Sequence, residues 1–160
     1  MQLLSLVLLF FSQPDVPLAP QCQKRAACAR LDYGFHSAFC FPSVRGIKTG
    51  KRITDVDYAN RAFTIPSGDK TYFVLHGAGP LWGSGSLPDP STVSDYSKRS
   101  FRSLQGDPVH DVRWTSPSGN RNRILSRPFE TAAYRDVPPP QAAALDKLLD
   151  GYCILPVKYP

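Results

Sequence analysis

Hydrophobic and polar residues alternate in short runs along most of the chain, a pattern typical of strands rather than long helices. The clearest case is a hairpin with arms at 61–65 and 70–75, joined by a Pro-Ser-Gly-Asp turn at 66–69. The arm at 70–75 has apolar side chains on both of its faces, so we expect it to lie centrally in a sheet. A second hairpin is predicted from 109–115 and 121–126, which flank a Ser-Pro-Ser-Gly-Asn turn.

Two segments have helical spacing instead. Three prolines at 138–140 lead into an Ala/Leu-rich run that ends before Gly151, which predicts a helix over about 140–151. Its apolar stripe consists of Leu145, Leu148, Leu149 and Tyr152. A second, short helix is predicted over about 92–104, where the apolar residues fall near one face and Thr92 and Asp95 are placed as in a capping box. The expected fold class is therefore α+β: a mainly antiparallel sheet with the C-terminal helix packed on it.

The start of the chain differs from the rest. Residues 1–11 are almost wholly apolar, a run too short for a membrane-spanning helix of about 20 residues but suited to a signal peptide. We predict a leader at 1–12, a Pro-rich linker at 13–21 and one domain at 22–160. No Lys or Arg precedes the apolar run and no small-x-small cleavage site follows it, so a cytosolic protein with an apolar N-terminal strand is the alternative.

Four cysteines fit an exported protein, because an oxidising compartment favours disulfides. A zinc site normally shows C-x2-C or a nearby His, and neither spacing is present, so no metal is expected. Of the three possible pairings, the one predicted is Cys22–Cys28 with Cys40–Cys153, which would tie the C-terminus to an early strand.

Positive charge is concentrated in one part of the chain. Residues 98–135 hold eight basic residues against three acidic ones, and so carry +5 of the net charge of +6. Seven of the eight are Arg, which suits carboxylate and phosphate contacts, and Trp and Arg are enriched at protein–protein interfaces. The predicted partner-binding residues are Trp82, Trp114, Arg113, Arg121, Arg123 and Arg127. The alternative is a solvated basic face with no partner.

Signals for catalysis are few. The string His-Gly-Ala-Gly at 76–79 resembles the oxyanion loop of α/β-hydrolases, but the chain has no G-x-S-x-G nucleophile motif. The glycines at 77–85 fit neither a Walker nor a Rossmann loop, so no cofactor is expected. The remaining enzyme hypothesis is a small secreted hydrolase in which His76 and His110 meet beside an acid and a loop Ser; the candidates are Asp107, Asp111, Ser84 and Ser86.

These observations favour binding over catalysis. The prediction is a small exported inhibitor, similar in kind to an immunity protein, that acts on a partner protein such as an enzyme or toxin in the periplasm, the cell envelope or the medium. An anionic polymer or a lipid surface is the second class of partner, and nucleic acid is the less natural one for an exported protein. An envelope structural component is the other alternative.

Overall fold

The computed structural model describes residues 15–23, 39–50, 53–55, 58–78, 87–128 and 130–155, with the backbone alone for 53–55, 58–60 and 78. The predicted leader at 1–12, Cys28, Trp82, Ser84 and Ser86 lie outside these residues.

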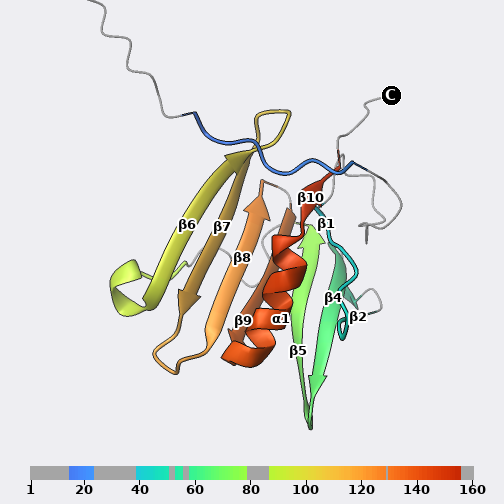
Figure 1. Cartoon of the computed structure of the whole chain (residues 1–160), viewed down its shortest axis with the longest axis vertical. Helices are drawn as coiled ribbons and strands as arrows, with labels where there is room; N and C mark the ends of the chain where they lie inside the picture. The colour runs from blue at the N-terminus through green and yellow to red at the C-terminus, as the bar shows by residue number, and fades with distance from the viewer. Residues whose placement is uncertain are drawn as a thin grey trace, which may run out of the picture.

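One antiparallel sheet dominates the structure (Figure 1). Its strands follow the order β2-β4-β5-β9-β8-β7-β6, and β3 pairs with β4 beside this path. The bounds are β2 Lys48–Thr49, β3 Ile53–Asp55, β4 Tyr58–Ser67, β5 Lys70–Ala78, β6 Ser94–Arg102, β7 Pro108–Thr115, β8 Arg121–Arg127 and β9 Glu130–Val137. A two-stranded sheet of β1 (Phe39–Cys40) and β10 (Cys153–Ile154) lies at one end. A single 3-10 turn, η1 (Pro90–Thr92), precedes β6.

Both predicted hairpins are confirmed. β4 pairs with β5 from Ser67↔Lys70 to Arg61↔His76, and the turn uses Gly68 at a φ of 63°. β7 pairs with β8 through a turn in which Gly119 has a φ of 85°. Glycine suits both positions because side chains rarely tolerate a positive φ. As expected, β5 is a central strand, between β4 and β9.

The C-terminal helix is also confirmed, as α1 (Pro139–Asp150), and it buries the predicted leucine stripe against the sheet. Pro139 and Pro140 open it. Gly151 at its end has a φ of −85°, so the backbone conformation does not require glycine there. A Cβ at Gly151 would lie 2.5 Å from Cγ of Pro42, so this glycine permits a close contact between chain segments.

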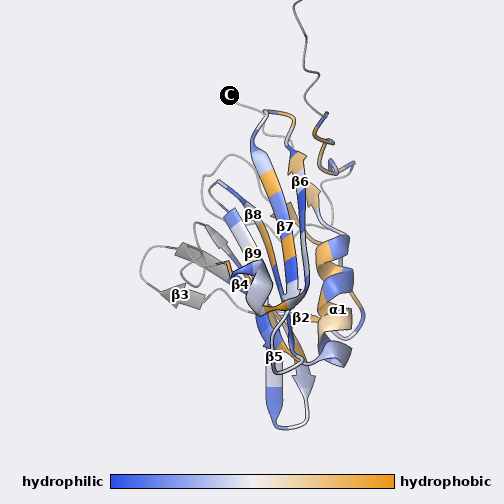
Figure 2. Ribbon diagram, turned by 90° about the vertical axis from the view of Figure 1, so that its left-hand side faces the viewer, coloured by the Kyte–Doolittle hydropathy of each residue, from blue (hydrophilic) through white to orange (hydrophobic). Residues whose placement is uncertain are grey.

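The main core lies between α1 and one face of the sheet. Leu145, Leu148 and Leu149 of the helix pack with Val74 of β5 and Leu125 of β8, all of them fully buried. Aromatic residues from the start of the described chain complete it: Phe39, Phe41 and Phe63 with Tyr152. Figure 2 shows α1 on this side of the sheet, and the opposite side is not covered by a helix of the described chain.

The predicted second helix over 92–104 is wrong, because residues 94–102 form strand β6. The residues that suggest one helical face are divided between the two faces of the sheet. Phe101 packs against the main core, and Val93 and Tyr96 pack on the opposite face around Trp114. A bulge between Ser94 and Ser97 shifts the register and produces this helix-like spacing within a strand.

Residues 17–22 cross the end of the sheet as an extended segment that we call the N-terminal strap (Figure 1). One part bonds to β6, where the N–H of Arg102 donates to the carbonyl of Pro17 and the N–H of Ala19 donates back to Arg102. Its last part bonds to β10, where the N–H of Cys22 donates to the carbonyl of Ile154. Most of the segment predicted as a linker is thus extended but tied to the fold at both ends.

The predicted disulfide pairing is wrong, because Cys22 bonds to Cys153. Cys40 is directly opposite Cys153 in the β1–β10 register and is itself disulfide-bonded. The strap runs on the other side of β10, which brings Cys22 to the same place. Strand β10 is therefore held from both sides, by β1 and by the strap.

Candidate functional site

The Arg-rich segment forms an internal ion-pair network rather than an open basic surface. Arg123 of β8 is fully buried, and its Nε and Nη2 donate to the two carboxylate oxygens of Asp111 at 2.9 Å each. Its guanidinium also contacts Asp146 at 3.0 Å and Asp150 at 2.9 Å, both on α1. The network therefore joins the sheet to the helix.

Two more arginines complete this network. Arg99 of β6 and Arg113 of β7 both donate to Asp111, and Arg113 also reaches Asp150 at 2.7 Å. Three arginines thus meet three aspartates, so they add little to the outward positive charge.

Asp111 lies at the centre of the network and stays ionised. Burial raises the pKa of its carboxyl, but hydrogen bonds and charge from Arg123, with further bonds from Arg113 and Arg99, outweigh burial and lower the pKa to about 2. Tyr134 donates its hydroxyl to Asp146 at 3.0 Å, and both burial and this carboxylate raise the pKa of Tyr134.

The other predicted binding residues are dispersed. Trp114 is only 5% exposed, and the guanidinium of Arg135 lies 5.5 Å from its ring centroid. Arg121 is exposed beside a small hollow near Trp114, whereas Arg127 lies at the opposite end of β8 and bonds to Asp107 at 3.1 Å. The described members of the predicted set therefore do not form one exposed patch, because Trp114 and Arg123 are inside the protein.

His76 and His110 lie on opposite faces of the sheet. His76 is the cross-strand partner of Ala132, and His110 shares its face with Ser126 and, through it, Thr131. Because Thr131 and Ala132 are consecutive in β9, their side chains point to opposite faces. The hydrolase hypothesis that joins the two histidines fails on this point.

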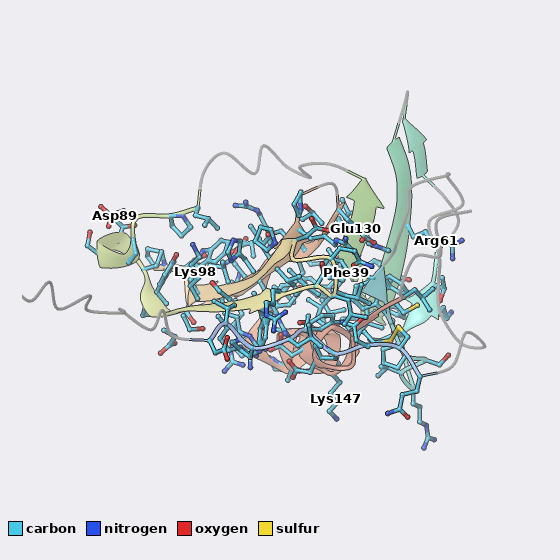
Figure 3. The ribbon with its side chains drawn as sticks, turned by 90° about the horizontal axis from the view of Figure 1, so that it is seen from above. Phe39, Arg61, Asp89, Lys98, Glu130 and Lys147 are labelled. Atoms are coloured by element: carbon cyan, nitrogen blue, oxygen red, sulfur yellow. A yellow bond between two sulfur atoms is a disulfide. The ribbon has the colours of Figure 1, made fainter. Side chains whose placement is uncertain are left out.

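His76 instead forms a buried pair with Glu130. Its Nε2 lies 2.6 Å from Oε1 of Glu130, which also accepts the N–H of Phe39 at 2.8 Å. The rings of Phe41 and Phe63 contact the imidazole. Figure 3 shows Glu130 and Phe39 close together in the interior. This buried pair therefore links β1, β5 and β9 within the main core.

The face of the sheet away from α1, which we call the open face, carries two adjacent rows of side chains. One row is mainly apolar, with Leu75, Ala133, Ile124, Val112 and Lys98 paired in register across β5, β9, β8, β7 and β6. The next is polar, with Thr131, Ser126, His110 and Ser100. The Ser100 hydroxyl lies 3.1 Å from Nδ1 of His110.

A hollow of about 380 Å³ lies where these rows meet. Its lining is Leu87, Lys98, Pro108, His110, Val112, Ile124, Ser126, Arg127, Pro128 and Thr131. Burial, and then the charge of Lys98, lower the pKa of His110 below its usual 6.5, so the imidazole is neutral at pH 7. Sequence reasoning singled out His110 but missed the hollow, since only the strand register brings its lining together.

The outer edge of β6 is the second candidate surface. β6 ends the sheet, and within the described chain its outer side pairs only at Arg102, with the N-terminal strap. Arg102 directs its N–H and carbonyl outward, so by the alternation of an antiparallel ladder Ser100 and Lys98 do the same. The mistaken helix assignment hid this edge from the sequence analysis.

Among the described residues, the cluster of side chains that could hold a metal ion by distance is made of three cysteines, and it does not support metal binding. The sulfur atoms of Cys22, Cys40 and Cys153 lie within 4.8 Å of one another, but all three residues are in disulfides and offer no thiolate.

No helix among the described residues is long and apolar enough to cross a membrane. The chain matches no protein-family model, and comparison with curated proteins and with solved structures finds no similar protein.

Proposed function

We propose that this chain is a small exported binding protein that holds a partner protein by adding one of the partner's extended segments to the outer edge of β6. The observation that carries the proposal is the edge itself: a nine-residue strand that ends the sheet and is paired on its outer side, among the described residues, only at Arg102. An unpaired strand edge offers a row of backbone donors and acceptors, the basis of recognition by strand addition.

The charge of β6 indicates which kind of partner segment would bind to it. β6 carries Lys98 and Arg102, besides Arg99, which pairs with Asp111, against Asp95 alone, so an acidic strand complements it. A second copy of β6 would bring these cations together, which disfavours pairing between two copies. Cations on an edge also protect a free strand from aggregation, so the proposal requires that an acidic strand binds where a neutral one does not.

Export is supported by the disulfide between Cys22 and Cys153 and by the second disulfide at Cys40, because such bonds persist in oxidising compartments. An inhibitor of an enzyme or toxin in the periplasm or envelope is the form of the proposal that fits a small, rigid binder with an open strand edge.

The test compares two substitutions at Ser100. Pro at this position removes an outward N–H while sparing the bonds to β7, because the N–H of residue 100 faces away from β7. Both Ser100→Pro and Ser100→Ala lose the hydroxyl contact with His110, so Ala is the matched control.

The full chain is titrated with a strand-forming peptide of alternating Val and Glu and with its Lys-substituted counterpart, and hydrogen exchange at the amides of Lys98 and Ser100 is followed by NMR. We expect the acidic peptide to slow exchange at both amides, Ser100→Pro to abolish its binding and Ser100→Ala to retain it. Equal binding of the basic peptide, or unchanged binding by the Pro variant, overturns strand addition.

With extract of the source cells, a single protein retained by wild type and Ser100→Ala but lost with Ser100→Pro identifies the partner. Retention of anionic polymer or lipid alone, lost as salt rises, rejects a protein partner.

A further inference from the structure

We propose that the hollow on the open face binds a small molecule that joins an apolar body to a carboxylate. This site shares only Lys98 with the β6 edge, by its side chain rather than its backbone, and the inference does not depend on the strand-addition proposal.

Size and lining define the apolar part. A volume of about 380 Å³ is within the range of small-ligand sites, roughly 300–1,000 Å³. Val112 and Ile124 are the central apolar residues, and Leu87, Pro108 and Pro128 add further apolar surface. Leu87 is 40% exposed, so apolar surface is available to a ligand.

The charge of the lining indicates that the polar part of the ligand is a carboxylate. None of the ten lining residues that the structure describes is acidic, whereas Lys98 and His110 both carry nitrogen atoms. The described residues give Lys98 no hydrogen bond or ion pair, and His110 contacts only the Ser100 hydroxyl among the hydrogen bonds of the described chain. Arg127 is bonded to Asp107 and is therefore not the primary anion contact. One available ammonium group matches a monoanion, and the hydroxyls of Ser126 and Thr131 can donate to carboxylate oxygens.

The pKa of His110 should respond to the charge of a bound ligand. Burial and the Lys98 cation hold the pKa of this imidazole below its usual value, so the site penalises positive charge when it is empty. Among the described residues, the other charged groups near it are Arg102, which is two residues from Ser100 on β6, and Arg127, which pairs with Asp107. A bound carboxylate adds negative charge beside His110 and raises its pKa, whereas a neutral ligand of the same shape does not.

The test is an NMR titration of the full chain with octanoate and, as its neutral counterpart, octanamide. We expect octanoate to bind saturably, with shifts at the methyl groups of Val112 and Ile124 and a rise in the pKa of His110. Octanamide is expected to bind at least about tenfold more weakly, because it lacks the charged contact with Lys98.

Lys98→Met is the main variant, and its folding is not at risk because Lys98 is exposed. It should weaken octanoate binding about tenfold and leave octanamide binding unchanged. Lys70→Met is the matched control, since exposed Lys70 lies at the far hairpin tip and does not line the hollow.

Three results would each overturn the inference: equal affinity for the acid and the amide, octanoate binding with no change in the pKa of His110, or shifts that do not saturate. Failure here would leave the Ser100 experiment unaffected, because that experiment measures strand pairing and uses no small ligand.

Discussion

Replacing Arg123 with Met removes the buried cation that links β8 to α1. The side chain has no exposed surface, and neither does that of Asp111, its bidentate partner. Breaking a buried ion pair by removing one partner costs about 3–5 kcal/mol, because the other charge stays desolvated. Arg99 and Arg113 still contact Asp111, so we expect a loss near the lower end, about 3 kcal/mol.

The free energy of unfolding is measured by urea denaturation with tryptophan fluorescence. The double variant Arg123→Met/Asp111→Leu removes both charges, and we expect it to be more stable than Arg123→Met alone because no buried carboxylate is left unpaired. Arg113→Met is the control: its side chain is 31% exposed, and its loss should cost at most about 1 kcal/mol. A cost below about 1 kcal/mol for Arg123→Met, or simple additivity with Asp111→Leu, would refute the assigned role.

Three further changes test other parts of the fold. The pKa of Asp111 is lowered from 3.8 to about 2, so its ionisation contributes about 2 kcal/mol to the free energy of unfolding. This contribution is complete above pH 5 and is lost as the pH falls from about 4 towards 2. Measuring the free energy of unfolding across this acid range should show the loss, and the Asp111→Asn variant should lack it. Replacing both Cys22 and Cys153 with Ser removes a crosslink that spans 131 residues. Loop entropy predicts that the free energy of unfolding, measured in denaturant, falls by up to about 5 kcal/mol. A change below about 1 kcal/mol would show that the strap alone holds β10. Gly151→Ala forces a Cβ against Pro42 and should cost about 1–3 kcal/mol in thermal unfolding, whereas an unchanged melting temperature would mean that this contact relaxes freely.

Local patterns were enough to predict the parts of the fold that depend on local interactions. The turn at Gly68 and the proline-led start of α1 are set by backbone preferences within a few residues, and both were correctly predicted. Strand β6 was not predicted correctly, because its apolar residues pack in two cores on opposite faces of the sheet. How they divide between the two faces depends on the partner strand β7.

The candidate site was harder to predict, since its residues meet only through pairing between distant strands. Arg123 is opposite Arg113 in the β7–β8 register, two residues from Asp111 and on the same face, so arginines that suggest a surface in the sequence are internal in the structure. Lys98, Val112 and Ile124 likewise meet through register alone. The order of strands around β10 likewise determines which cysteine pairs with Cys153, because Cys22 approaches β10 from the side opposite Cys40.

The position of β10 has a consequence for the order in which the protein can be made. Ile154 accepts a hydrogen bond from Cys22 of the strap, donates one to Pro20 and pairs with Phe39 of β1, so segments that leave the ribosome early cannot complete their pairing until residue 154 has been made. The hairpins can form while the chain is being synthesised, but the core around β10 cannot close until residue 154 has emerged. A chain that stops before Cys153 would carry an open core with Cys22 unpaired. Proteases that remove incompletely folded chains would therefore degrade copies that lack this junction.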